Sequence, residues 1–215
     1  NQARFFARDV SFEDGDGRFE LVVDGAPVAR VRLSIPGRHN VANALAAIAA
    51  AAATGVDPVE AARACEAFQG VRRRFDVLGE PQGITVVDDY AHHPTAVEAV
   101  VDAARKRYPG RRVVALFEPH QASRTRQHFD HFARALAGAD RAVVADIYVC
   151  RDTPEDVKAV TAKDLARAVT KLTPHAPALA PGAGLMAVAL GLLRPGDVAL
   201  FMGAGRMSGL AQEAA

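Results

Sequence analysis

The stretch ITVVDDYAHHPT, residues 84–95, decides how most of the chain is interpreted. Its apolar run Ile84–Val87 is typical of a buried strand, and Pro94 is a residue favoured at the start of a helix. A buried strand that leads through a polar loop into a helix is the repeating unit of a parallel sheet. We therefore expect a strand, a functional loop and then a helix near Thr95–Arg107.

The same alternation continues towards the C-terminus. Further strands are expected at Val113–Phe117, Ala142–Ala145 and Val198–Phe201, with a shorter one at Ala176–Ala180. Further helices are expected at Arg126–Leu136, Ala162–Leu172 and Leu185–Leu192. Strands that alternate with helices predict an α/β fold with a mostly parallel sheet covered on both faces.

The residues before this region follow a different pattern. Residues 1–35 are expected to form β structure, in which Phe19–Val23 and Val28–Leu33 flank an Asp24-Gly25 turn as a hairpin. Two helices are expected next, at Asn40–Thr54 and Asp57–Phe68. We place the domain boundary near Arg72–Phe75, where the rhythm of the sequence changes.

Composition excludes several classes of protein. The chain has 26 Lys and Arg against 25 Asp and Glu, so its net charge of +1 gives no strong field towards nucleic acid or membrane. Aromatic residues are 6% with no Trp, which argues against a stacking platform for single-stranded nucleic acid. No apolar run reaches the length of a membrane span. The two cysteines, Cys65 and Cys150, have no metal or redox spacing, which favours the cytoplasm.

Two polar clusters fall where a parallel sheet binds its ligands, just past the carboxyl ends of strands. One is Asp88–Pro94, and the other is Glu118-Pro119-His120, followed by Arg124 and Arg126. Three interpretations are open. The Asp, Glu and His residues have the donor types of metal ligands. The carboxylates can instead cap helices and organise loops. In the third interpretation, which we favour, the two arginines bind an anionic substrate through forked hydrogen bonds.

Three other segments carry functional residue types. Asn40 and Asn43 open the first helix, and an Asn amide matches the donor and acceptor edge of adenine, although capping and exposure are simpler roles. Arg74 beside Phe75 is a candidate ligand residue. The glycine-rich segment Gly203–Gly205 is better explained as a tight turn than as a phosphate loop.

Four motifs occur in an order that resembles the Mur ligases of peptidoglycan synthesis. They are GRHNVANA at 37–44, RRF at 73–75, DDYAHHPT at 88–95, and FEPH at 117–120 with SRTR at 123–126. The resemblance spans about residues 20–205. It implies that residues 1–71 are the C-terminal remnant of a central ATP-binding domain and that residues 72–215 form a Rossmann-like C-terminal domain.

The resemblance also implies an activity. A member of this kind uses ATP to join L-alanine to UDP-N-acetylmuramate through an acyl phosphate. Its Mg²⁺ ligands would lie in an N-terminal part that this chain lacks. Because the chain has no G-x-x-x-x-G-K-[ST] motif, we expect it to be inactive alone. Exposed sheet edges in residues 1–71 lead us to expect self-association.

Site residues are implied by the same motifs. Asn40 and Asn43 would contact adenine, with His39 near the nucleotide. Arg74 and Asp89 would hold the ribose and phosphate side. The remaining residues, His92, His120 and Arg124, would bind the amino-acid carboxylate and the nascent product.

Two departures from the family pattern are visible. The family often has Arg-Tyr after Pro-His, where this chain has Gln121-Ala122, and its closing Gly-Ala-Gly-Asp ends here in Arg206. Three alternatives stay open: the family member that reattaches recycled peptide to UDP-muramate, a non-catalytic module that binds nucleotide or amino acid, and a metal-dependent hydrolase.

Overall fold

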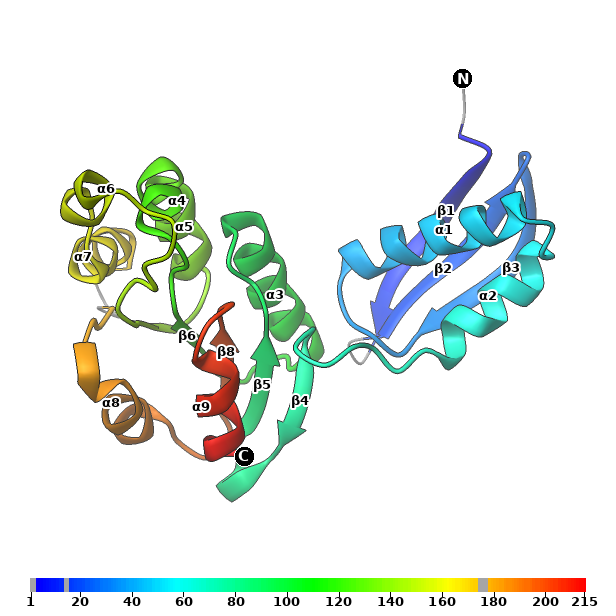
Figure 1. The fold of residues 1–215 in the computed structure, drawn as a ribbon. Helices are drawn as coiled ribbons and strands as arrows, with labels where there is room; N and C mark the ends of the chain where they lie inside the picture. Colours follow the sequence, from blue (N-terminus) through cyan, green and yellow to red (C-terminus); the bar gives the residue numbers. More distant parts are fainter. Residues whose placement is uncertain (1–2, 14–15, 174–177) are drawn as a thin grey trace. The chain divides into compact units, whose positions relative to one another are not determined.

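The computed structural model describes residues 3–13, 16–173 and 178–215 (Figure 1). It divides into two compact units. Unit 1 is Asn1–Gly70 with Lys106–Pro109, and unit 2 is Val71–Arg105 with Gly110–Ala215.

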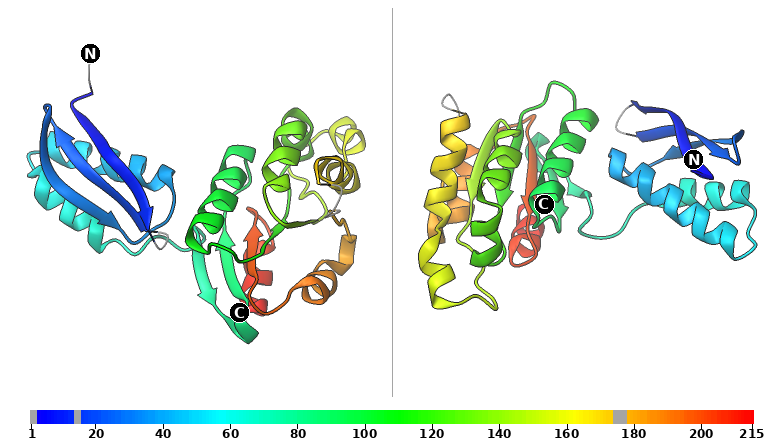
Figure 2. Two further views of the ribbon diagram at one scale, coloured as in Figure 1. Left: turned by 180° about the vertical axis from the view of Figure 1, so that it is seen from behind. Right: turned by 90° about the horizontal axis from the view of Figure 1, so that it is seen from above.

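Unit 1 is a three-stranded antiparallel sheet covered by two helices. Its elements are β1 (Phe5–Glu13), β2 (Asp16–Val23), β3 (Ala26–Leu33), α1 (Arg38–Ala53) and α2 (Pro58–Ala67), with the strands in the order β1-β2-β3. Both helices lie on one face of this sheet (Figure 2). Alternate strand residues such as Leu21 and Leu33 are buried in one cluster with Ile48 of α1, as period-2 patterning requires.

The expected hairpin of unit 1 is confirmed. Asp24 and Gly25 connect β2 to β3 with φ values of 49° and 82°, the positive pair that a tight hairpin turn needs. Asp57 begins α2 by accepting hydrogen bonds from the backbone N–H groups of Val59 and Glu60. The hairpin is extended by β1, which sequence analysis did not separate as a strand.

Unit 2 is an α/β domain. Its strands are β4 (Asp76–Gly79), β5 (Thr85–Asp89), β6 (Val113–Phe117), β7 (Arg141–Val144) and β8 (Val198–Met202). Its helices are α3 (Pro94–Arg107), α4 (Ala122–Gln127), α5 (Phe129–Ala137), α6 (Pro154–Ala159), α7 (Ala162–Leu172), α8 (Leu185–Leu192) and α9 (Met207–Ala214), with short 3-10 turns at Pro81–Gly83 and Gly182–Gly184. The strand order is β4-β5-β8-β6-β7, parallel except for β4.

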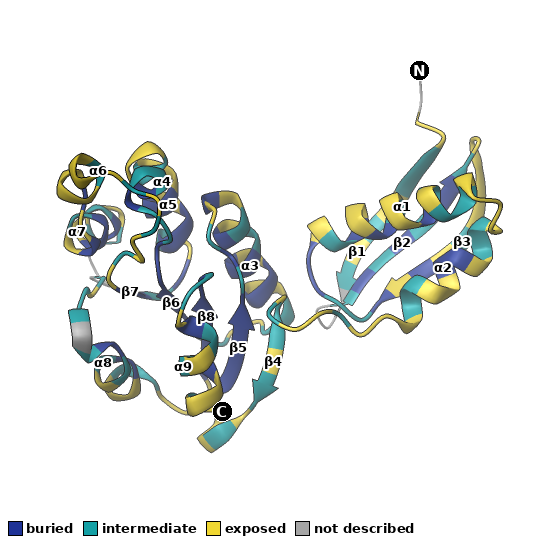
Figure 3. Cartoon of the chain, in the orientation of Figure 1, coloured by how far each residue is buried: buried dark blue, intermediate teal, exposed yellow. Residues whose placement is uncertain are grey.

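Helices cover both faces of this sheet. Every residue of β5, β6 and β8 is buried, which explains the continuous apolar runs of β6 and β8 (Figure 3). Leu116 and Phe201 point to one face and pack in a cluster with Met207 of α9. Phe117, one residue further along β6, points to the other face, where its ring lies 5.3 Å from that of Phe132 in α5. The predicted α/β class is confirmed.

One expected helix and one expected strand differ from the structure. The helix expected at Arg126–Leu136 is two helices, α4 and α5, because His128 leaves the helical conformation with φ −112° and ψ 23°. Residues 176–177 of the expected strand Ala176–Ala180 lie outside the described residues. Leu179 forms a single parallel bridge with Val143.

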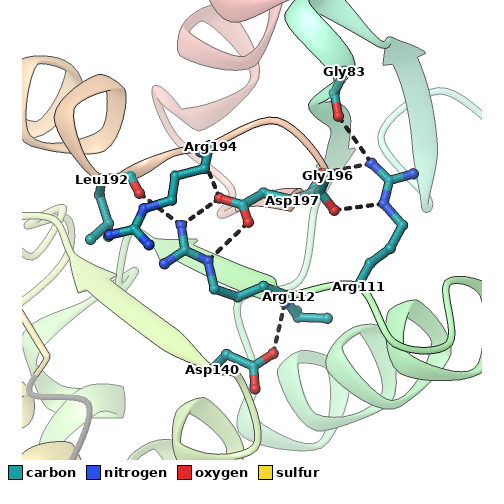
Figure 4. Close-up of polar contacts among 9 residues, drawn as sticks. Gly83, Arg111, Arg112, Asp140, Leu192, Arg194, Gly196 and Asp197 are labelled. Carbon is teal, nitrogen blue, oxygen red and sulfur yellow. Dashed lines mark hydrogen bonds and ion pairs between the residues drawn. The ribbon is translucent and has the colours of Figure 1, made fainter.

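Arg111 and Arg112 bind the segment that leads into β8, at the edge of the sheet where β6 and β8 begin (Figure 4). Arg112 donates from Nε and Nη2 to the buried carboxylate of Asp197, at 2.9 and 2.6 Å. Arg111 donates to the backbone carbonyls of Gly196 and Asp197 at 2.7 and 2.8 Å. These contacts hold the starts of β6 and β8 side by side. None of the helices in the described part of the chain is long and apolar enough to cross a membrane.

Candidate functional site

Loops from neighbouring strands meet at the carboxyl edge of the unit 2 sheet. Because β8 lies between β5 and β6 and runs parallel to both, the segments that follow these strands emerge at one edge. His92 follows β5 and His120 follows β6, and their rings lie edge to face with centroids 5.8 Å apart. The structure therefore brings the two predicted polar clusters together.

Asp89 is a buried carboxylate that organises its own loop. It is 4% exposed, and it accepts hydrogen bonds at 2.7 Å from the backbone N–H groups of Phe75 and Ala91. Burial raises the pKa of Asp89, an effect that these two N–H groups and the charge of Arg74 oppose. Asp89 thus fixes the turn at residues 73–75 against the end of β5.

Arg73 makes closer contacts with the neighbouring loops than Arg74 does. It donates from Nη2 to the carbonyl of Gly203 at 2.9 Å, and its guanidinium lies 4.6 Å from the centroid of the Tyr90 ring. The Arg74 side chain is exposed, and its guanidinium lies 5.6 Å from the same ring. Sequence analysis assigned no role to Arg73, because nothing local distinguishes it from its two Arg neighbours.

Two further buried carboxylates connect the motifs to the segment after β8. Asp88 accepts a hydrogen bond of 2.5 Å from Ser208 Oγ in α9. Glu118 is 1% exposed and accepts hydrogen bonds from both the backbone N and the Nε of Arg206. The basic residue at the end of the Gly-Ala-Gly segment therefore complements a buried acid.

His92 has a defined tautomer. Its Nδ1 lies 2.8 Å from the carbonyl oxygen of Tyr90, and a carbonyl oxygen only accepts hydrogen bonds. Nδ1 therefore carries the proton, which leaves Nε2 of a neutral His92 as an acceptor. The Tyr90 ring also packs edge to face on His92, with centroids 5.1 Å apart.

His120 is half-buried among aromatic and thiol groups. Its ring stacks on that of Tyr148, with centroids 5.2 Å apart and planes 11° from parallel. Cys150 Sγ lies 3.6 Å from Nε2 of His120. Burial lowers the pKa of His120, and the nearby His92 and Arg124 lower it further. The lowered pKa favours the neutral form of the imidazole.

The two arginines that follow this motif differ in position. Arg124 is half-buried in α4 and donates to the carbonyl of His120 over 3.4 Å, a long bond that leaves most of its donors available. Arg126 is exposed and forms an ion pair with Asp156 at 2.9 Å. Gln121 donates to the carbonyl of Cys150 at 3.2 Å, so at this position the side chain binds a neighbouring loop.

The candidate nucleotide residues of unit 1 lie at the start of α1. Asn40 donates to the carbonyl of Pro36 at 2.7 Å and accepts a hydrogen bond of 3.2 Å from the amide of Asn43. The exposed Asn43 amide is therefore oriented by Asn40. The His39 ring lies over Gly37, where an added Cβ would come within 2.6 Å of His39 Cε1.

Within residues 3–13, 16–173 and 178–215, no group of three or more His, Cys, Asp and Glu side chains is arranged to hold a metal ion. Chemically, the edge of unit 2 offers a half-buried cation, Arg124, beside two imidazoles, which suits a small ligand that carries a carboxylate. The buried Asp89 and Glu118 accept hydrogen bonds from protein groups with both carboxylate oxygens. Asp88 accepts one with Oδ2, and its Oδ1 has no hydrogen-bond partner among the described residues.

Comparisons with known proteins show which family this chain resembles. Residues 73–205 match the family described as "Mur ligase, glutamate ligase domain". A protein from Kineococcus radiotolerans named UDP-N-acetylmuramate–L-alanine ligase is 42% identical over 209 residues, 95% of this chain and 44% of that protein. A protein of the same name from Halorhodospira halophila is 45% identical over 213 residues, 94% of this chain and 43% of that protein.

Two solved structures are similar over nearly the whole chain. The crystal structure of UDP-N-acetylmuramate–alanine ligase from Thermotoga maritima has a TM-score of 0.78 at 25% identity, covering 99% of this chain and 45% of that one. A murein peptide ligase from Psychrobacter arcticus has a TM-score of 0.69 at 28% identity, covering 99% of this chain and 44% of that one. The chain spans less than half the length of these proteins. By sequence and by fold, the chain belongs to the Mur ligase family.

Proposed function

We propose that this chain is the C-terminal portion of an ATP-dependent ligase that joins L-alanine to UDP-N-acetylmuramate in peptidoglycan synthesis. The observation that carries the proposal is the approach of His92 and His120 at adjacent strand ends, with Arg124 in the following helix. The relatives that cover most of this chain are named for this reaction, which supports the choice of substrates.

The amino-acid site is assigned to unit 2. Arg124 binds the carboxylate of L-alanine, since a guanidinium matches a carboxylate with two parallel hydrogen bonds. His120 and His92 border the reacting amine. Because burial lowers the pKa of His120, its neutral form is favoured, and a neutral ring does not repel an ammonium group. The ammonium group of L-alanine first loses a proton to solvent, and the resulting amine attacks the carbonyl carbon of the acyl phosphate. The tetrahedral intermediate then releases phosphate and a second proton, which leaves the amide.

Candidate nucleotide contacts are assigned in each unit separately. Asn43 and Asn40 contact adenine, and His39 lies near the nucleotide. Arg74 and Asp89 serve its ribose and phosphate side, where Asp89 acts mainly by holding the turn that carries Arg74. Residues 1–71 correspond to the end of a central ATP-binding domain and residues 72–215 to the C-terminal domain.

ATP supplies the phosphoryl group that activates the muramate carboxylate, and Mg²⁺ neutralises charge on the transferred phosphate. We assign no residue of this chain to Mg²⁺, and the chain contains no G-x-x-x-x-G-K-[ST] motif. We propose that the P-loop contacts to the transferred phosphate and the Mg²⁺ ligands belong to the part of the relatives that this chain does not span. We further propose that the isolated chain is inactive, self-associates through residues 1–71, and acts in the cytoplasm.

A second candidate within the family is the ligase that attaches a recycled peptide to UDP-muramate. The 28% identity to the Psychrobacter arcticus murein peptide ligase supports this second candidate. Release of ADP, with L-alanine or an L-Ala-γ-D-Glu-diaminopimelate tripeptide as acceptor, separates the two. The assay uses the chain together with the N-terminal portion of the Kineococcus radiotolerans relative. Activity with L-alanine supports the first proposal, and activity with the tripeptide alone overturns it.

A further inference from the structure

The loop after β7 runs beside the segment assigned to the amino acid. Tyr148 forms a parallel bridge with His120, which continues the β6–β7 alignment past the strand ends. Tyr148 donates from its backbone N to the carbonyl of Pro119 at 2.8 Å and accepts from the N–H of Gln121 at 2.9 Å. The loop therefore contacts the candidate site at Tyr148, Cys150 and Asp152.

Asp152, at the end of this loop, closes the first turn of α4. The residue at the N-cap position, Gln121, makes no side-chain cap and has a φ of 74°. Asp152 supplies the missing acceptor. Its Oδ2 accepts from the backbone N of Ala122 at 3.0 Å, and its Oδ1 accepts from the N and Oγ of Ser123 at 3.0 and 2.7 Å. Oδ2 also accepts from the N–H of Cys150 at 3.1 Å, which fixes the loop itself.

This arrangement changes how an anion can bind at the second polar cluster. The first N–H groups of α4 are already bonded to a carboxylate of the chain. A substrate carboxylate therefore depends on side chains such as Arg124 rather than on the helix terminus. The position of Arg124, one residue after Ser123, depends in turn on the anchoring of that turn.

We propose that Asp152 is a positioning residue for the amino-acid site, because its carboxylate fixes the turn between His120 and Arg124. The inference rests on the proposed function for the identity of the ligand. Asp152 makes no contact with substrate in this account. Its effect passes through Ala122 and Ser123.

A graded set of variants tests the proposal. Ser123→Ala removes one of the four hydrogen bonds. Asp152→Asn keeps Oδ1 but turns an NH₂ group towards two N–H donors, and Asp152→Ala removes all four bonds. Asp164→Asn is the matched control, since Asp164 is also half-buried and accepts from the N and Oγ1 of Thr161 in the cap of α7.

The first readout compares the change in the KM for L-alanine with the change in the KM for ATP. Both are measured by ADP release from the chain mixed with the N-terminal portion of the Kineococcus radiotolerans relative. Asp152→Asn is expected to raise the KM for L-alanine about tenfold, Asp152→Ala more and Ser123→Ala about twofold, with the KM for ATP unchanged. Asp164→Asn is expected to leave both KM values unchanged. If Asp152→Ala shifts the KM for L-alanine no more than Asp164→Asn does, the proposal is wrong.

The second readout does not depend on catalysis. In the 215-residue chain alone, amide hydrogen exchange at Ala122 and Ser123 is expected to quicken about tenfold in Asp152→Asn, with a shifted His120 Cε1–H resonance. Asp164→Asn should change neither signal. Unchanged exchange in Asp152→Asn overturns the positioning role even where ligase activity is present. Changed exchange without activity on L-alanine upholds the positioning role and rejects the proposed function.

Discussion

Glu118 and Arg206 are joined by two hydrogen bonds: Oε2 of the carboxylate accepts from the backbone N–H at 2.8 Å, and Oε1 accepts from Nε at 3.0 Å. Gly205 precedes Arg206 and lies so close that an added Cβ would overlap Glu118 Oε2. The Gly-Ala-Gly-Arg segment is therefore shaped around a buried carboxylate at the end of β6.

Gly205→Ala is expected to lower the free energy of unfolding by about 1–3 kcal/mol, because the new methyl displaces a buried, hydrogen-bonded carboxylate. Gly209→Ala is the matched control, since no atom lies within 4 Å of its added Cβ. Because Gly209 lies in α9, this variant should gain up to about 1 kcal/mol. Urea unfolding followed by circular dichroism measures both. Equal effects of the two variants would contradict the close contact at Gly205.

Arg112→Ala is expected to cost about 3 kcal/mol of unfolding free energy, since it leaves the buried Asp197 carboxylate with one backbone donor. The control Arg167→Ala removes an exposed i,i+3 pair with Asp164 and should cost less than about 0.5 kcal/mol. The same urea experiment compares them. A loss below about 1 kcal/mol for Arg112→Ala would show that the network in Figure 4 adds little.

The pKa of His120 is expected to lie below 6.5. It should rise in Arg124→Gln, which removes a neighbouring positive charge, and in His92→Gln, which removes the electrostatic effect of the neighbouring ring. It should stay below 6.5 in both, since burial is the larger cause. The NMR titration of the Cε1–H signal measures these values.

The same shift has a consequence for stability. As pH falls from above 6.5, the unfolded chain binds a proton at this group before the folded chain does, so the free energy of unfolding decreases until the folded pKa is passed. His120→Gln should remove this contribution. A wild-type pKa at or above 6.5 would contradict the described surroundings of the ring.

Asn43→Ala is expected to weaken ATP binding about tenfold without loss of stability, because its amide is exposed and bonded only to another side chain. Asn40→Ala should weaken ATP binding and also cost about 1 kcal/mol of stability, since Asn40 binds the carbonyl of Pro36. Calorimetric titration with ATP and thermal unfolding measure the two effects. Identical ATP affinity in Asn43→Ala and wild type would reject the adenine assignment.

Much of the sheet could be predicted because its central strands are buried on both faces. The bounds expected for Val113–Phe117 coincide with β6, and those of Ala162–Leu172 with α7. The short elements β4, α6 and α9 were missed. An edge strand of four residues and a helix of six residues carry too little periodicity to stand out.

The position of the two polar clusters could be predicted from the sequence, but most of their contacts could not. Polar residues that follow two buried strands predicted that the ends of β5 and β6 carry a candidate site, and His92 and His120 do meet there. Sequence could not show that Asp89 and Glu118 are bonded to backbone and side-chain donors, because these contacts join distant segments. Asp152 was missed for the same reason, since its partners lie 29 and 30 residues away.

The most direct test of the central claim is ADP release with ATP, Mg²⁺, UDP-N-acetylmuramate and L-alanine. The chain is assayed alone and then with the N-terminal portion of the Kineococcus radiotolerans relative, with Arg124→Ala as the site control. We predict no ADP release by the chain alone, L-alanine-dependent release on mixing, and loss of that release in Arg124→Ala. Release by the chain alone, or release on mixing that is unaffected by Arg124→Ala, would contradict the account.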